Sequence, residues 1–275
     1  MLSSAFGPEW LRQYGPWAVV AGASEGIGAE FALMLAEAGM NLVLVARTRE
    51  TLEGIASECG DHGVQVRVLS LDLTHADCVS EISSATVDIE IGLLVYNAGA
   101  NTHSAEFIDG DLAEFRRVID LNVTAPLALI HRLCGPMRER RRGGVVLVGS
   151  LSGYLGAARH TVYGGVKAFA RIFAEGLWLE LREYNVHVLE LVLGVTDTPA
   201  MRRIGLNLEV PGMHISTAKD VAAQGLTSLP QGPIHVASGN ENNPVLQPMT
   251  DRAQAILASH RMMQKLIEGT APHSH

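Results

Sequence analysis

Short apolar runs separated by helix-like stretches are the feature that most constrains the fold of this chain. Six runs lie at residues 18–21, 42–45, 64–69, 93–96, 145–148 and 186–192, and a weaker seventh lies at 234–237. Helical patterns lie between them, at residues 31–38, 48–59, 111–140 and 161–184. Buried strands that alternate with helices typically form a parallel sheet with both faces covered. The sequence therefore predicts an α/β fold with a doubly wound, Rossmann-like parallel sheet of about seven strands.

Glycine and proline predict where some of the helices end or bend. Gly39 and Gly60 follow two helical patterns directly, as C-cap glycines do. Pro126 lies inside the long pattern at residues 111–140, where we expect it to bend the helix.

The chain of 275 residues shows no internal repeat and no low-complexity linker. We therefore expect residues 1–275 to form a single domain. Residues 198–217, rich in glycine, proline and apolar side chains, are expected to form a lid over a substrate. A C-terminal helix is expected at residues 250–268.

Composition excludes several classes of partner. The formal net charge of −8 argues against nucleic acid or an anionic membrane surface as the main partner. Three scattered cysteines favour a reducing compartment, and the eleven histidines form no metal-binding motif, so no metal site is expected. No run approaches the ~18–20 apolar residues of a membrane span, and the N-terminus lacks signal-peptide features. We expect a cytoplasmic protein without a membrane span.

A glycine-rich turn follows the first apolar run. Gly22 can make a tight turn, Gly26 allows the backbone to approach a pyrophosphate, and Gly28 permits close packing of helix on strand. The following helix would offer unpaired N–H groups to phosphates. The alternative is a purely structural turn. The residues expected to bind a dinucleotide here are Gly22, Ser24, Gly26, Ile27 and Gly28.

The end of the second run bears on the choice of cofactor. Dinucleotide folds that bind NAD place an acidic residue about 20 residues beyond the glycines. This chain has Ala46 there, followed by Arg47, which can pair with a 2′-phosphate. NADP(H) is therefore preferred and NAD(H) remains possible, because Arg47 could instead point to solvent and Glu25 in the glycine turn would repel a phosphate. Asp72 and Leu73, after the third run, are candidates for the adenine edge.

Tyr163 and Lys167 lie one helical turn apart, and Ser150 follows the fifth run. A phenol has a pKa near 10, which an adjacent ammonium and an oxidised nicotinamide ring are expected to lower. A hydroxyl beside the phenol can hold a substrate oxygen and stabilise developing charge. These three residue types can therefore perform general acid–base chemistry on a carbonyl or an alcohol.

Taken together, these motifs resemble the short-chain dehydrogenase/reductase family over nearly the whole chain. The residues that match are Gly22 to Gly28, Tyr96-Asn97-Ala98-Gly99, Asn122, Ser150 and Tyr163-x-x-x-Lys167, in the order of the family. The resemblance implies one Rossmann-like domain with seven strands, an NAD(P)-dependent reaction and a homodimer or homotetramer.

The resemblance also implies roles for individual residues. Tyr163 is the general acid/base, Lys167 binds the nicotinamide ribose and lowers the tyrosine pKa, and Ser150 positions the carbonyl. Asn122 anchors a water that links Lys167 to solvent; the alternative is an asparagine that bonds local backbone. The remaining cofactor contacts are assigned to Asn97 and Gly99 on the adenosine side and to Thr196 and Thr198 at the nicotinamide carboxamide.

The chain departs from the family pattern at four places. Ala21 replaces the usual threonine, Tyr96 the first asparagine of Asn-Asn-Ala-Gly, and Leu193 the proline before Gly194. Two glycines, Gly164 and Gly165, follow Tyr163 where other small residues are usual. Each glycine should loosen the helix by about 1 kcal/mol relative to alanine. None of these changes removes a catalytic group.

The residues expected to face the substrate are largely apolar: Tyr154, Leu155, Leu193 and Met201. The alternative is that several of them only fill the core beneath the lid. The sequence therefore predicts an NADPH-dependent oxidoreductase that interconverts a hydrophobic ketone and a secondary alcohol. The alternatives are an NAD-dependent alcohol dehydrogenase of the same family and a catalytically silent dinucleotide-binding scaffold.

Overall fold

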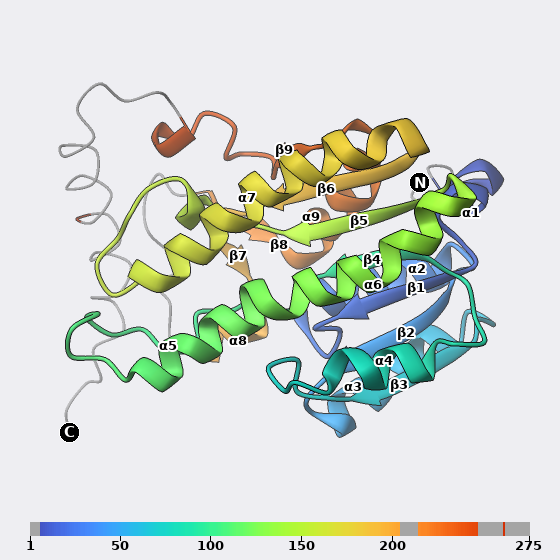
Figure 1. The fold of residues 1–275 in the computed structure, drawn as a ribbon, viewed down its shortest axis with the longest axis horizontal. Helices are drawn as coiled ribbons and strands as arrows, with labels where there is room; N and C mark the ends of the chain where they lie inside the picture. The colour runs from blue at the N-terminus through green and yellow to red at the C-terminus, as the bar shows by residue number, and fades with distance from the viewer. Residues whose placement is uncertain (1–5, 204–213, 247–260, 262–275) are drawn as a thin grey trace.

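A seven-stranded parallel sheet forms the centre of the computed structural model, which describes residues 6–203, 214–246 and 261 (Figure 1). The strand order is β3-β2-β1-β4-β5-β6-β9, and every neighbouring pair is parallel. The strands are β1 (Trp17–Ala21), β2 (Asn41–Ala46), β3 (Val66–Ser70), β4 (Ile91–Tyr96), β5 (Gly143–Val148), β6 (Val186–Val192) and β9 (Ile234–Val236). The predicted doubly wound α/β fold is confirmed, and each of the seven predicted runs is a strand.

Helices cover both faces of the sheet. One face carries α2 (Gly26–Glu37), α3 (Arg49–Gly60) and α9 (Ala218–Ser228), and the other carries α4 (Cys78–Ala85), α6 (Ala125–Arg140) and α7 (Thr161–Leu181). Alternate strand residues serve the two layers: Val20 packs into the core beneath α2, and Val19 packs into the core beneath α6. This period of two follows from the pleat of a strand. Buried on both faces, the strands read as continuous apolar runs.

Four of the described α-helices lie outside the predicted patterns: α1 (Pro8–Tyr14), α4, α8 (Pro199–Arg203) and α9. Gly39 ends α2 with φ of +87°, which confirms its predicted capping role. The same prediction for Gly60 is wrong, because Gly60 is the last residue of α3 and the chain continues in helical turns through Asp61. The left-handed residue after α3 is Gly63, with φ of +80°.

The long helix predicted over residues 111–140 consists of three parts. α5 (Leu112–Ile119) is followed by a π-helical segment, Asp120–Thr124, and then by α6. The irregularity thus precedes Pro126, which lies in the first turn of α6. π-Helical turns inside α-helices are rare and often occur at functional sites.

The predicted lid and C-terminal helix are only partly described. Residues 198–203 contain α8 (Pro199–Arg203), and β7 (Thr196–Asp197) pairs with β8 (Ser216–Thr217). Residues 204–213 lie outside the described residues, as does the helix expected at 250–268 except for Arg261. Within the described parts of the chain, no helix is long and apolar enough to cross a membrane.

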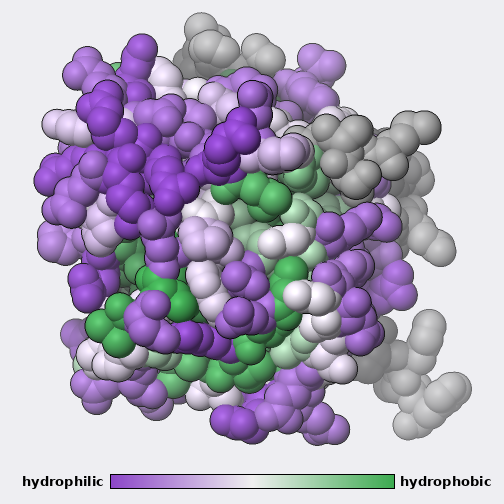
Figure 2. All heavy atoms as spheres, turned by 90° about the vertical axis from the view of Figure 1, so that its right-hand side faces the viewer, coloured by the Kyte–Doolittle hydropathy of each residue, from purple (hydrophilic) through white to green (hydrophobic). Residues whose placement is uncertain are grey.

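The carboxyl ends of the strands point toward α5, α8 and the start of α7 (Figure 1). The opposite face, at the amino ends of the strands and α1, is largely hydrophilic with smaller hydrophobic areas (Figure 2). The candidate site described below lies at the carboxyl edge, as expected for a parallel α/β sheet.

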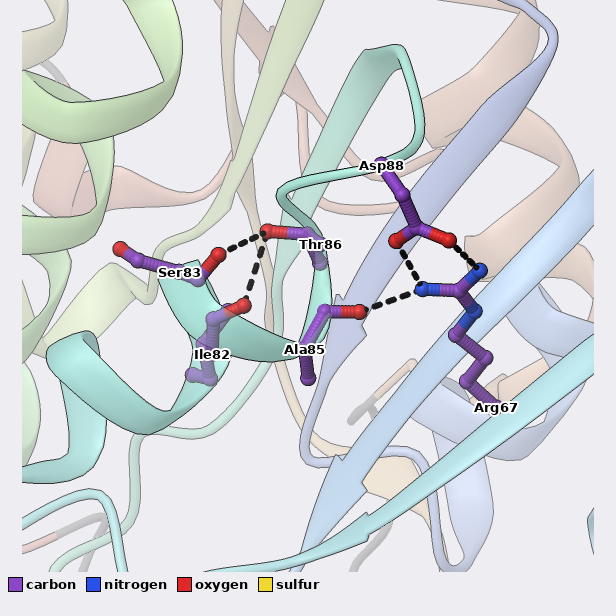
Figure 3. Close-up of polar contacts among 6 residues, drawn as sticks. All are labelled: Arg67, Ile82, Ser83, Ala85, Thr86 and Asp88. Atoms are coloured by element: carbon purple, nitrogen blue, oxygen red, sulfur yellow. Dashed lines mark hydrogen bonds and ion pairs between the residues drawn. The ribbon is translucent and has the colours of Figure 1, made fainter.

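A charged contact fixes the end of α4 against the edge strand β3 (Figure 3). Arg67 of β3 binds Asp88 through two nitrogens, at 2.7 and 2.8 Å, and donates to the Ala85 carbonyl at 2.6 Å. Thr86 caps the same helix end, since its hydroxyl donates to the carbonyl of Ile82 at 2.8 Å. The hydrogen bonds from Arg67 lower the pKa of Asp88 to about 2.

Replacement of Asp88 by asparagine should therefore lower stability at neutral pH only slightly, because the pair is exposed. A carboxylate with a depressed pKa stabilises the folded state above its unfolded pKa and loses that effect as the pH falls toward 2. Thermal unfolding of the wild type and Asp88→Asn between pH 7 and 2 should show a difference that disappears at the acid end. A difference that persists unchanged at pH 2 would contradict this account.

Candidate active site

The glycine turn between β1 and α2 forms a cradle that only glycine can line. Gly22 has φ of +82°, and a Cβ there would lie 2.8 Å from the Ala98 nitrogen. A Cβ on Gly28 would lie 1.9 Å from the Gly22 carbonyl oxygen. Gly26 has φ of +56° and faces Thr198, whose Cβ would be 3.3 Å from an added Cβ. This close approach fits the backbone cradle that a dinucleotide pyrophosphate requires.

The end of β4 is fastened directly to this turn. Asn97 donates to the Gly22 carbonyl at 2.9 Å, and the Asn97 and Ala98 nitrogens both donate to the Ala21 carbonyl, at 3.0 and 2.9 Å. These bonds hold the two strand ends together although Ala21 lacks the hydroxyl that the family usually places there.

The adenosine side is set by the ends of β2 and β3. Arg47 is exposed after β2, while Asp72 and Leu73 follow β3, with Leu73 buried. Burial acts to raise the pKa of Asp72, but hydrogen bonds from Thr74 outweigh it and lower that pKa. Arg117 of α5 lies 3.8 Å from the other carboxylate oxygen.

The negative charge of Glu25, in the glycine turn, is paired with an arginine that was not predicted to belong to the site. Arg203 of α8 donates to Glu25 through two nitrogens, one of them at 2.7 Å. These hydrogen bonds lower the pKa of Glu25. The carboxylate that counted against a 2′-phosphate therefore has a cationic partner, and the pair joins segments 178 residues apart.

Ser150, Tyr163 and Lys167 meet at the end of β5. Ser150 follows β5 after Gly149, and its hydroxyl accepts a bond from the Ser152 nitrogen at 3.1 Å. The Ser150 hydroxyl lies close enough to Tyr163 to act on the pKa of the phenol. Lys167 Nζ lies 5.6 Å from the centre of the Tyr163 ring. A phenol, a hydroxyl and an ammonium so placed can donate and accept a proton at one substrate oxygen.

Within the chain alone, burial raises the pKa of the Tyr163 phenol, and the nearby Ser150 hydroxyl only partly opposes this. The reason is that desolvation of the phenolate outweighs the favourable contacts that the chain itself provides. The expected lowering involves the oxidised nicotinamide ring as well, so it stays a prediction.

Lys167 is buried and held by one backbone bond. Its Nζ donates to the Val148 carbonyl at 2.9 Å. Burial lowers its pKa to about 8, and the charge of Glu190 opposes this shift. A Cβ on Gly99 would lie 2.7 Å from Nζ and 2.8 Å from Asn122 Oδ1. Gly99 therefore lets strand, lysine and asparagine come together.

Asn122 lies in the π-helical segment, buried beside this group. Its amide nitrogen donates to the Val118 carbonyl at 2.9 Å and to the Ala100 carbonyl at 3.2 Å, while Oδ1 has no hydrogen-bond partner in the part of the chain that the structure describes. The bonds to local backbone agree with the alternative role considered for this residue. The Tyr96 hydroxyl donates to the Leu121 carbonyl at 2.6 Å, so the tyrosine that departs from the family pattern fastens β4 to this segment. A pocket between α6 and α7 is lined by Asn122 and Lys167.

The remaining predicted residues are two cofactor contacts, Thr196 and Thr198, and the residues expected to face the substrate. Thr196 is buried, and Thr198 lies against Gly26. Leu155 and Leu193 are buried and Met201 is half-buried.

Tyr154 turns toward α7, where the Arg171 guanidinium lies 4.2 Å from its ring centre. Sequence reasoning missed Asn240, whose Oδ1 would be 2.2 Å from a Cβ on Gly194, and the buried Glu190. Only Glu190 left a visible signal, as a carboxylate within an apolar run.

The sheet order, the glycine cradle and the Ser150–Tyr163–Lys167 group define an NAD(P)-dependent oxidoreductase of the Rossmann-like class. A family model for short chain dehydrogenases matches residues 16–208. The chain belongs to the short-chain dehydrogenase/reductase family, whose members act on CH–OH and C=O groups.

Two curated relatives illustrate the range of the family. The chain is 34% identical over 189 residues to the 7beta-hydroxysteroid dehydrogenase of Clostridium sardiniense, a match that covers 68% of this chain and 72% of the relative. It is 36% identical over 189 residues to the very-long-chain 3-oxoacyl-CoA reductase of Laccaria bicolor, a match that covers 66% of this chain but only 56% of the relative. The chain thus spans little more than half of the reductase.

Solved structures show the same fold. A 7beta-hydroxysteroid dehydrogenase superposes with a TM-score of 0.82 at 25% identity, over 90% of this chain and 98% of the other. A short-chain dehydrogenase from Sphingobium yanoikuyae in complex with NADPH superposes with a TM-score of 0.75 at 26% identity, over 95% and 98% of the two chains.

Proposed function

We propose that this protein is an NADPH-dependent reductase that interconverts a bulky apolar ketone and its secondary alcohol. The observation that carries the proposal is the Ser150–Tyr163–Lys167 group beside a glycine cradle at one sheet edge. Reduction requires a proton donor at the carbonyl oxygen, and the buried Tyr163 phenol is proposed as that donor. A protonated phenol is the form that can give a proton to a carbonyl oxygen.

The cofactor would be held at two ends of the site. The backbone of Gly22 to Gly28 and the first turn of α2 would bind the pyrophosphate. Asp72, Leu73, Asn97 and Gly99 would line the adenosine side, and Thr196 and Thr198 the nicotinamide end. When bound, the nicotinamide ring supplies the hydride for reduction.

The chain's own residues would handle the proton. Tyr163 gives its proton to the carbonyl oxygen, which Ser150 positions by a hydrogen bond. Lys167 stabilises the phenolate that results by its positive charge. The unpartnered Oδ1 of Asn122 and the pocket beside it offer a route by which water can return a proton to Lys167.

Arg47 is proposed to select NADP(H) by pairing with the 2′-phosphate. Its exposure leaves it open to a ligand, and the Glu25–Arg203 pair removes the nearby negative charge that would repel a phosphate. Arg47→Asp should weaken NADPH binding about tenfold or more while NADH binding changes much less. Fluorescence titration with both cofactors measures this. Arg49→Asp is the matched control, since Arg49 pairs with Glu53 at 2.9 Å; equal losses for both cofactors in Arg47→Asp would refute the assignment.

The substrate class rests on the apolar surroundings and on the relatives. Leu155, Leu193 and Met201 offer no cationic group to a small anionic acid. Two relatives are named for a steroid and for a very-long-chain acyl-CoA, which both contain a large apolar part, and this supports the same class here. Oxidation of NADPH followed at 340 nm with bulky apolar ketones and with small polar ketoacids tests it. Faster turnover of the ketoacids would overturn the substrate assignment.

We also propose that the protein assembles as a homodimer or homotetramer and that it acts in the cytoplasm. α7 presents Phe169, Ile172 and Leu179 with exposures of 40%, 59% and 61%. Large apolar side chains on one exposed helix are typical of a subunit contact.

A further inference from the structure

Glu190 is a buried carboxylate in the middle of β6. Its exposure is 0%, and neither carboxylate oxygen has a hydrogen-bond partner among the described residues. Burial of an unpaired carboxylate costs several kcal/mol unless a nearby charge compensates. The position therefore needs an explanation that packing of the sheet does not give.

The side chain points to the face of the sheet that α7 covers. Val188, two residues earlier on the same side of the strand, packs into the core beneath α7, whereas Leu189 and Leu191 pack into the opposite core. A Cβ on Gly149 would lie 2.3 Å from Glu190 Oε1, so the carboxylate lies directly against the Val148–Gly149 peptide. The carbonyl of that peptide accepts the hydrogen bond from Lys167 Nζ at 2.9 Å.

Charged groups reach Glu190 mainly from α7. Lys167 and Arg171 favour its ionised form, and Glu175, two turns beyond Lys167, opposes it. The charge of Glu190 also acts on Tyr154, whose ring lies against the Arg171 guanidinium, and β9 contributes the apolar Ile234 opposite Glu190 in the ladder. Burial raises the pKa of Glu190 to about 7, and Lys167 and Arg171 limit that shift.

We infer that Glu190 is the buried counter-charge that keeps the Lys167 ammonium protonated, and that it is thereby a positioning residue for proton transfer at Tyr163. The two side chains act across one peptide group, without a direct hydrogen bond. In a dry environment a charge at this range still has a strong effect. The catalytic part of the inference rests on the proposed function, whereas the effect on Lys167 does not.

The chain offers a direct readout, because it contains three lysines, Lys167, Lys219 and Lys265. Protein labelled with 13C at the lysine ε-carbon should therefore give three titrating NMR signals, with Lys167 assigned by its loss in Lys167→Met. The midpoint of Lys167 should fall by about one pH unit in Glu190→Gln, since a nearby opposite charge shifts a pKa by one unit or more. Glu190→Leu, which also removes the unpaired oxygens, should give the same shift.

Glu175→Gln is the matched control, because it removes a carboxylate from the same helix. Its Lys167 midpoint should stay close to the wild-type value. An unchanged Lys167 midpoint in both Glu190 variants would overturn the inference, even if the melting temperatures of these variants fall.

Where the wild type turns over a ketone, the alkaline limb of kcat/KM should move to lower pH together with the Lys167 midpoint; a limb that stays in place would overturn the catalytic part. Absence of turnover with every ketone, combined with a shifted midpoint, would refute the proposed function and support the inference.

Discussion

Tyr163→Phe should lower turnover by a factor of about 10²–10⁴ while cofactor binding is retained. That range is the usual contribution of a positioned general acid. The ring of phenylalanine keeps the packing of Tyr163 but removes the hydroxyl that lies near Ser150. Steady-state NADPH oxidation measures the first quantity and fluorescence titration with NADPH the second.

Tyr184→Phe serves as the control for this substitution. Tyr184 is 39% exposed beyond the end of α7, beneath the guanidinium groups of Arg138 and Arg141. Its replacement should leave turnover unchanged. Wild-type turnover in Tyr163→Phe would show that the proton comes from another group, and loss of cofactor binding would show that the tyrosine acts mainly in binding.

Gly28→Ala is expected to have the largest effect on folding and cofactor binding together. The added methyl group would lie 1.9 Å from the Gly22 carbonyl oxygen and 2.7 Å from Asn97 Nδ2. Both contacts belong to fixed backbone or to a hydrogen-bonded side chain, so the cradle must open. Overpacking of this kind costs about 1–3 kcal/mol or more. Chemical denaturation with urea measures that loss, and the same protein should show no measurable NADPH binding.

Gly165→Ala provides the opposite case on α7. No atom of the described residues lies within 4 Å of a Cβ added at Gly165, so alanine should stabilise the helix by up to about 1 kcal/mol. A Cβ added at the neighbouring Gly164 would lie 3.0 Å from the Ser152 carbonyl oxygen, so the two positions are not equivalent. A wild-type urea midpoint in Gly28→Ala would mean that helix and strand do not pack as closely as the structure indicates.

The sheet could be read from the sequence because strands buried on both faces leave a simple pattern of apolar runs. All seven strands were predicted on this basis, and the glycine turn was predicted from the glycines that follow the first run. The helices α1, α4 and α9 were missed because their apolar residues are few or are interrupted by polar ones. Gly60 was wrongly predicted to be a C-cap, because the backbone of the next residue, Asp61, is still in a helical conformation.

The chemistry of the site was predictable by residue type but not by environment. Ser150, Tyr163 and Lys167 lie together as their spacing indicates. The upward shift in the pKa of Tyr163 depends on burial, which no spacing reports. Likewise, the pairing of Glu25 with Arg203 joins residues far apart in sequence, and the π-helical segment around Asn122 has no local sequence signature.

The close approach of Lys167 and Asn122 to Gly99 has an evolutionary consequence. Any of the other amino acids would bring a carbon atom within 2.7 Å of the Lys167 ammonium and 2.8 Å of the Asn122 oxygen. Every missense change at this codon therefore requires Lys167 Nζ and Asn122 Oδ1 to move, whatever residue it encodes. A lineage that depends on Lys167 is under stronger constraint at position 99 than in the exposed parts of α7.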